Sequence, residues 1–113
     1  MEAASQDDKT VFVVAYEGNT AIGCGAYLPL DDSSVELKRF YVEPDKRGTG
    51  VAAEIFRYLS DKARALGYTS LKLETGDEQP EAIRFYTKNG FNRIDRYGKY
   101  VDSKSSVCME KVL

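Results

Sequence analysis

A glycine-containing loop with a cation at its start lies in the middle of the chain, at Arg47-Gly48-Thr49-Gly50-Val51-Ala52. Its two glycines let the backbone approach a ligand closely, because no Cβ lies in the way. Unpaired N–H groups at the start of a helix, together with the positive end of the helix dipole, attract phosphate oxygens. Arg47 adds a planar cation beside these amides. The segment therefore predicts a binding loop for a phosphorylated ligand.

The chain contains no histidine, and this excludes several common catalytic sites. A Ser-His-Asp triad, a Cys-His pair and an H-E-x-x-H zinc site all need that residue. Cys24 and Cys108 lie far apart and lack metal-ligand spacing. We therefore expect no metal site and expect both thiols to be buried as small hydrophobic groups. Any catalysis must use carboxylates, tyrosines, backbone dipoles or a bound cofactor.

Length and charge limit the class of protein. The 113 residues are enough for one domain with one core. A net charge of −2 lacks the basic footprint of a nucleic-acid-binding protein. No apolar run reaches the roughly 18 residues that span a membrane, and no signal peptide opens the sequence. We expect a cytoplasmic protein without nucleic-acid or membrane partners.

Apolar periodicity places the loop between a strand and a helix. Residues 35–42 favour a strand, which ends before Pro44 because proline cannot donate to a sheet ladder. Gly67 suits the end of a helix over 51–66. Apolar side chains recur there at helical spacing, at Val51, Ile55, Leu59, Ala63 and Leu66.

The other periodic segments predict a single α/β domain over residues 11–113, while the polar segment 1–10 is expected to be disordered or frayed. A second, short helix begins at Pro80. The element order is β-β-β-α-β-α-β-β, a mixed sheet with an initial meander and parallel pairing where helices connect strands. The predicted strands are 11–16, 21–28, 35–42, 69–75, 91–97 and 107–112.

Two blocks of sequence resemble a known family. The first is R-x-x-G-x-A at Arg47, Gly50 and Ala52, preceded by the stretch 36–44. The second combines Leu73-Glu74-Thr75-Gly76, Gln79-Pro80-Glu81-Ala82-Ile83-Arg84-Phe85-Tyr86 and Asn89-Gly90-Phe91. Together and in this order, they resemble the acetyl-CoA-binding core of the GCN5-related N-acetyltransferases (GNAT). The resemblance extends from Val11 to the C-terminus.

The resemblance implies the GNAT-like acyl-CoA N-acyltransferase fold, here without the family's usual N-terminal strand and helices. It also implies an acetyl-CoA-dependent N-acetyltransferase, with acetyl-CoA (coenzyme A) as the acyl donor. The acceptor would be a primary amine of a small molecule, peptide or protein, acetylated by direct attack in a ternary complex. An uncovered hairpin edge without the usual front elements would favour a homodimer.

Cofactor contacts follow from the resemblance position by position. In the family, backbone N–H groups of the loop bind the CoA pyrophosphate. The strand before the loop parts from its neighbour at a bulge, and the pantetheine arm pairs with its exposed backbone. Val42 would direct its N–H at the thioester oxygen; its alternative is an ordinary ladder residue. Gln79 occupies the position of a pantetheine-binding asparagine. The implied contacts are Phe40, Tyr41, Val42, Arg47, Gly48, Thr49, Gly50, Val51, Ala52 and Gln79.

Two residues occupy catalytic positions of the family. Glu36 stands where histone-acetylating relatives place a catalytic glutamate, and its alternative is a solvated strand residue. Glu43 and Glu74 are weaker candidates for the same base. Tyr86 stands where the family has its general acid, and its alternative is a core aromatic. Because a phenol (pKa ~10) is a weaker acid than a thiol (~8.5), hydrogen bonding to the leaving thiolate would be its main role.

Two other functions remain open from the sequence. The segment 48–53 also fits a loose G-x-G-x-x-A dinucleotide fingerprint, but Pro44-Asp45-Lys46-Arg47 separates it from the strand. The second is a non-catalytic acyl-CoA-binding module or regulatory subunit, which would keep the cofactor groove without an acceptor site.

Overall fold

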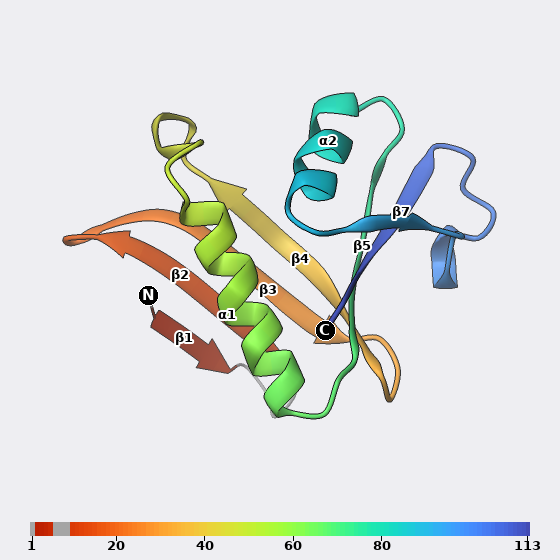
Figure 1. Cartoon of the computed structure of the whole chain (residues 1–113), viewed down its shortest axis with the longest axis horizontal. Helices are drawn as coiled ribbons and strands as arrows, with labels where there is room; N and C mark the ends of the chain where they lie inside the picture. Colours follow the sequence, from red (N-terminus) through yellow and green to blue (C-terminus); the bar gives the residue numbers. More distant parts are fainter. Residues whose placement is uncertain (1, 6–9) are drawn as a thin grey trace.

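The computed structural model describes residues 2–5 and 10–113. Within these residues, seven strands form one mixed sheet in the order β1-β2-β3-β4-β5-β7-β6. Figure 1 shows helix α1 crossing β2 and β3, while α2 lies near β5 and β7. The elements are β1 (Glu2–Ser5), β2 (Val11–Glu17), β3 (Thr20–Pro29), β4 (Ser34–Val42), the 3₁₀ turn η1 (Pro44–Lys46), α1 (Val51–Ala65), β5 (Ser70–Gly76), α2 (Pro80–Lys88), β6 (Asn92–Ile94), the 3₁₀ turn η2 (Gly98–Tyr100) and β7 (Ser106–Val112).

The predicted element order is confirmed from β2 onward. Strands β2, β3 and β4 form an antiparallel meander. The α1 crossover then connects β4 to β5, which are parallel neighbours; a parallel pair needs a crossover connection of this kind. The fold is therefore the mixed α/β arrangement expected from the sequence.

The prediction of a disordered or frayed segment over residues 1–10 is wrong at Glu2–Ser5. These residues form β1 and pair antiparallel with β2, from Glu2 opposite Val14 to Ser5 opposite Val11. An edge strand can be held by backbone hydrogen bonds alone, without a periodic pattern of apolar side chains. The sequence of β1 therefore gives no local sign that it forms a strand. Residues 1 and 6–9 lie outside the described residues, and for them the prediction stays a prediction.

Strand β1 also changes two further expectations. A strand does precede the hairpin, although residues 2–5 and 10 contain no helix. β1 covers the hairpin edge that would have favoured a homodimer, because it pairs along β2. The exposed edge of this end of the sheet is therefore the outer side of β1.

The strand predicted over 91–97 is shorter than expected. Only Asn92–Ile94 pair with β7 as β6, and the chain then leaves the sheet toward η2. The Arg96 side chain donates from Nε to the Ser106 carbonyl and from Nη2 to the Lys104 carbonyl, at 3.2 Å each. These side-chain bonds stabilise a loop where the sequence predicts a ladder.

The core lies between the sheet and α1. Ile55, Leu59 and Ala63 are fully buried on one face of α1, as their spacing predicts. Gly25 of β3 allows close packing, since a Cβ there would lie 2.9 Å from Ile55 Cγ2. Cys108 is buried as expected, whereas Cys24 is half-exposed and donates to the Arg39 carbonyl. Among the described residues, neither helix is long and apolar enough to cross a membrane.

Candidate active site

A fork between β4 and β5 is the starting point of the site. The two strands pair only from Ser34 opposite Ser70 to Glu36 opposite Lys72. On its other side, β4 carries a bulge at which Arg39 and Phe40 both face Gly25 of β3, and Arg39 has a φ of 53°. Because a bulge bends and twists its strand, β4 leaves β5 beyond Glu36. One edge of its backbone is then open.

The backbone of Val42 faces that open edge. The Glu43 N–H donates to the Ile22 carbonyl at 2.9 Å, so these two residues form a hydrogen-bonded pair between β3 and β4. Hydrogen-bonded and non-hydrogen-bonded pairs alternate in an antiparallel ladder. The next pair, Val42 opposite Gly23, therefore directs both backbone groups of Val42 away from β3. The N–H of Val42 is a donor at the open side of the fork.

The start of α1 supplies further unpaired donors. Gly50 is the N-cap residue with a φ of 92°, and no side chain in the described part of the chain caps the helix. The Glu54 N–H makes the bond to the Gly50 carbonyl, so the amides of residues 51–53 lack a helical acceptor. Aligned amides and the positive end of the dipole form an anion-binding end.

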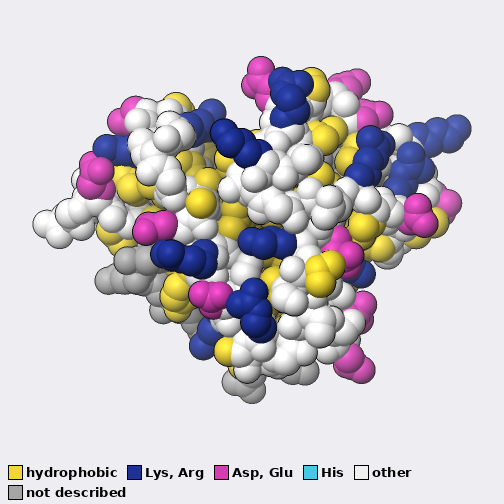
Figure 2. All heavy atoms as spheres, in the orientation of Figure 1, with side chains coloured by type: hydrophobic (Ala, Val, Ile, Leu, Met, Phe, Trp, Pro, Cys, Tyr) yellow, Lys and Arg dark blue, Asp and Glu magenta, His cyan; other side chains and the backbone are white. Residues whose placement is uncertain are grey.

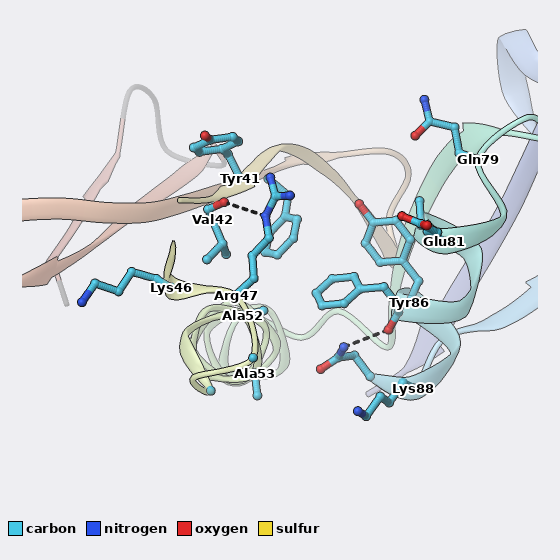
Figure 3. A pocket seen from close by; sticks show the side chains of 16 residues that line it. Tyr41, Val42, Lys46, Arg47, Ala52, Ala53, Gln79, Glu81, Tyr86 and Lys88 are labelled. Atoms are coloured by element: carbon cyan, nitrogen blue, oxygen red, sulfur yellow. Dashed lines mark hydrogen bonds between the residues drawn. The ribbon is translucent and has the colours of Figure 1, made fainter. Parts of the chain in front are cut away.

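A cleft of about 730 Å³ joins these features. One wall comes from the end of β4, η1 and the start of α1, and the other comes from α2 (Figure 3). Lys and Arg side chains gather on this face of the molecule (Figure 2). The lining residues are Phe40, Tyr41, Val42, Lys46, Arg47, Gly48, Gly50, Ala52, Ala53, Gln79, Glu81, Ala82, Phe85, Tyr86, Lys88 and Asn89.

Local contacts fix the two cations on the loop wall. The Arg47 Nε donates to the Val42 carbonyl at 3.2 Å, and the guanidinium lies 6.0 Å from the centre of the Tyr41 ring (Figure 3). The Lys46 ammonium forms an ion pair with Glu17 at 2.7 Å. This hydrogen bond with Glu17 raises the pKa of Lys46. The Lys46 side chain therefore carries its positive charge at neutral pH.

Aromatic rings form the floor of the cleft and connect its walls. Phe40 stacks on Phe56 of α1 with ring centres 4.6 Å apart. The ring centre of Tyr86 in α2 lies 6.2 Å from that of Phe40 and 5.7 Å from that of Phe91. Figure 3 shows Tyr86 projecting from α2 into the cleft. Burial raises the pKa of Tyr86, so its hydroxyl keeps its proton and is a hydrogen-bond donor.

Glu36 lies at the closed end of the fork and does not line this cleft. It is buried, and its Oε2 accepts a 2.6 Å hydrogen bond from the Tyr97 hydroxyl. The Lys38 ammonium lies 3.1 Å from Oε1. Burial and the bond to Glu36 raise the pKa of Tyr97, so the phenol remains the donor. Glu36 is thus a fixed carboxylate beside the fork, not a solvated strand residue.

Comparison with known proteins identifies the family. A family model described as the acetyltransferase (GNAT) family matches residues 2–91. The chain belongs to the GNAT family. Its class of enzyme is therefore the acetyltransferases.

This GNAT chain is similar in sequence to named acetyltransferases and in fold to solved structures. An IAA acetyltransferase from Azospirillum brasilense is 37% identical over 103 residues, covering 90% of this chain and 67% of that protein. A Klebsiella pneumoniae protein assigned as an acyl-CoA N-acyltransferase is 33% identical, with a TM-score of 0.84 over 93% of this chain and 73% of its own. The PaiA N-acetyltransferase from Thermoplasma acidophilum, solved with coenzyme A, shares the fold at 23% identity, with a TM-score of 0.79 over 93% of this chain and 62% of its own.

Most of the predicted GNAT site residues lie together at the cleft. Three do not line it. The Thr49 hydroxyl donates to the Lys46 carbonyl, the Val51 side chain packs on the core, and Glu36 lies at the closed end of the fork. The predicted residues that line the cleft are Phe40, Tyr41, Val42, Arg47, Gly48, Gly50, Ala52, Gln79 and Tyr86.

Part of the α2 wall and the partners of Glu36 were not predicted from the sequence. Ala82, Phe85, Tyr86 and Asn89 all line the cleft, and their i, i+3, i+4, i+7 spacing marks one face of a helix. That periodicity was available in the sequence. Strand alternation could have placed Lys38 on the face of Glu36. Tyr97 had no comparable signal, because a loop brings it to Glu36 across 61 residues of sequence.

Proposed function

We propose that this GNAT enzyme transfers an acetyl group from acetyl-CoA to a primary amine of a small molecule or protein. The transfer is a direct attack in a ternary complex, without a covalent enzyme intermediate. One observation carries the proposal: unpaired amides at the start of α1, an open β4 edge and the Tyr86 hydroxyl meet in a single cleft.

The phosphates and the pantetheine arm of acetyl-CoA would bind different parts of the cleft. The amides of residues 51–53 and the Gly48–Gly50 backbone would bind the pyrophosphate, with Arg47 and Lys46 as neighbouring cations. The arm would then follow the open β4 edge like an added strand. The outward N–H of Val42 supports a role in binding the thioester oxygen.

The chemistry needs a base, an oxyanion donor and a donor for the leaving group. The amine nitrogen forms a bond to the thioester carbon, and the carbon–sulfur bond breaks. Glu36 accepts the proton lost by nitrogen, directly or through water. The Val42 N–H stabilises the oxyanion, and the Tyr86 hydroxyl donates to the departing thiolate. Since burial raises the pKa of Tyr86, we assign it hydrogen bonding and not complete proton transfer.

The acyl-CoA-binding module without activity is the second candidate. It shares the cleft and predicts acetyl-CoA binding without acetylation. Relatives named as acetyltransferases favour catalysis. The dinucleotide alternative is disfavoured by η1, which separates β4 from the glycine loop.

Two measurements on the wild-type chain test the proposal. Isothermal titration calorimetry measures acetyl-CoA binding, and release of free CoA measures turnover with a panel of primary amines. The proposal expects binding together with CoA release and formation of the acetylated amine by mass spectrometry. Binding without turnover on any amine would favour the module, and the absence of binding would exclude both.

A further inference from the structure

We propose that the amine acceptor also carries a carboxylate, as a free amino acid does, and that Lys72 and Lys99 bind this carboxylate beside Glu36. This inference rests on the proposed acetyl transfer and defines the substrate class of the same site. It comes from a cluster of charged and aromatic side chains at the closed end of the fork, formed by Glu36, Lys38, Lys72, Tyr97, Lys99 and Tyr100.

The cluster lies on the sheet face opposite α1. Val35 and Leu37 belong to the core together with the buried face of α1. Side chains alternate along a strand, so Glu36 and Lys38 project from the other face. Leu71 and Leu73 are buried in the same core, which places Lys72 on the face of Glu36. An acceptor at this cluster would approach the fork from the face opposite α1.

Tyr97 and Tyr100 complete the cluster from the loop between β6 and β7. Their rings lie edge to face, 5.5 Å apart. The Tyr97 hydroxyl donates to Glu36, and the Lys38 ammonium lies 3.1 Å from the Tyr100 hydroxyl. The two rings therefore form an apolar surface around a fixed carboxylate. Such a surface suits the side chain of a small organic acceptor.

Positive charge exceeds negative charge within the cluster. Glu36 is paired with Lys38. The Lys72 ammonium lies 5.5 Å from the centre of the Tyr97 ring, and the Lys99 ammonium lies 5.4 Å from that of Tyr100. Neither forms an ion pair with a carboxylate of the described residues. Two cations are thus left for an external anion.

Nearby carboxylates have other partners. Glu110 lies opposite Lys72 in the ladder, but its Oε2 accepts a 2.6 Å hydrogen bond from Ser70. The Oε2 of Glu74 accepts a 2.7 Å hydrogen bond from Ser106. These serine hydrogen bonds orient the two carboxylates but leave their negative charge in place, so the inference rests on Lys72 and Lys99 having no ion pair among the described residues.

These charges distinguish an amino acid from a simple amine. The amine of the acceptor would bind Glu36, which is also the proposed base. A simple ammonium ion at Glu36 would lie near Lys72, which has no ion pair among the described residues, and like charges repel. A carboxylate on the acceptor would neutralise that repulsion and bind Lys72 and Lys99. Selectivity therefore depends on the second charged group of the acceptor.

Matched acceptors provide the test. CoA release is measured with the twenty standard amino acids, and for the best of them also with its carboxamide and its decarboxylated amine. We expect kcat/KM for the free acid to exceed that of both neutralised forms at least about tenfold. The variants K72Q and K99Q should each lower kcat/KM for the acid about three- to tenfold, whereas kcat/KM for the carboxamide should not fall and should rise where the lost lysine repelled its ammonium group. K104Q in the same loop is the matched control, because Lys104 has an exposed side chain.

The outcomes separate this inference from the proposed function. Equal turnover of the acid, the carboxamide and the amine overturns the inference and leaves acetyl transfer standing. Loss of activity with the carboxamide in K72Q, matched by a lower melting temperature, also overturns it, because that pattern indicates a structural role. Acetyl-CoA binding without transfer to any compound overturns the inference and the proposed acetyl transfer together.

Discussion

At the scale of the residue, Tyr86 is the group whose role depends most on its surroundings. Its ring packs on Phe40 and Phe91, while its hydroxyl projects into the cleft (Figure 3). Tyr86 therefore combines the two roles that the sequence left as alternatives: its ring packs as a core aromatic, and its hydroxyl is available as a hydrogen-bond donor. Tyr86→Phe keeps the ring packing and removes only the donor.

We expect Y86F to lower kcat about a hundredfold, with little change in the affinity for acetyl-CoA. Because the pKa of Tyr86 is raised by burial above its ordinary value of 10.0, the hydroxyl stays protonated at neutral pH. The pH dependence of kcat should thus keep its shape in Y86F up to pH ~10. Steady-state kinetics and calorimetry measure the two quantities. Y41F is the control, since Tyr41 lines the same cleft from β4, and an unchanged kcat in Y86F would reduce Tyr86 to a packing residue.

Glu36 shows how far single residues could be predicted. Its type and position made it a candidate base, and its alternative was a solvated strand residue. The structure instead buries it with a tyrosine and a lysine as partners. Lys38 is two positions away on the same strand, so alternation alone placed the two on one face. The contact of Tyr97 with Glu36 could not be predicted from the sequence, because no local pattern indicates which distant residue a loop will contact.

At the scale of the element, the two ends of α1 allow a matched experiment. Gly50 has a φ of 92° at the start of the helix, and Gly67 has a φ of 93° beyond its end. A Cβ added at either would meet no atom within 4 Å. Alanine at either position should therefore lower the free energy of unfolding by about 1–2 kcal/mol, because a residue with a Cβ disfavours the left-handed backbone conformation.

Only one of these two variants should affect the ligand. G50A should weaken acetyl-CoA binding at least about tenfold, because it changes the backbone at the unpaired amides of the helix start. G67A should bind acetyl-CoA like the wild type. Calorimetry gives the affinities, and urea unfolding checks that the losses of stability match. Equal affinity of the two variants would contradict the phosphate-binding assignment of this loop.

Element order and element ends differed in how well the sequence predicted them. Both helices were predicted because apolar spacing, Pro80 and the glycines at their ends are local signals. β1 was missed, and β6 was predicted too long, for the opposite reason. β1 is held by its backbone pairing with β2, and β6 ends where Arg96 binds two carbonyls across the loop.

At the scale of the whole molecule, the arrangement of charge matters more than its sum. The net charge is −2, which alone would disfavour a polyanion such as CoA. Yet Lys46, Arg47 and Lys88 all line the cleft. Affinity for acetyl-CoA should therefore fall as the salt concentration rises, because dissolved ions screen the charges of these side chains.

Lys88 permits a test of this local field. K88Q should weaken acetyl-CoA binding about two- to fivefold at low salt and reduce the dependence of affinity on NaCl. K62Q removes the same charge from the far end of α1 and should change neither quantity. Calorimetry across a range of NaCl concentrations measures both. A salt dependence that is identical in K88Q and the wild type would place Lys88 outside the ligand field.

The sequence by itself determined the order of the elements from β2 onward, the glycine loop and the candidate donors, because helix periodicity, chain reversal at glycine and helix-start amides are encoded within a few neighbouring residues. Tertiary structure alone decided that β4 parts from β5 beyond Glu36, that α2 forms the second wall of the cleft and that a distant loop carries Tyr97 to Glu36. These features depend on strand pairing and packing between segments far apart in the chain. No local pattern contains that information.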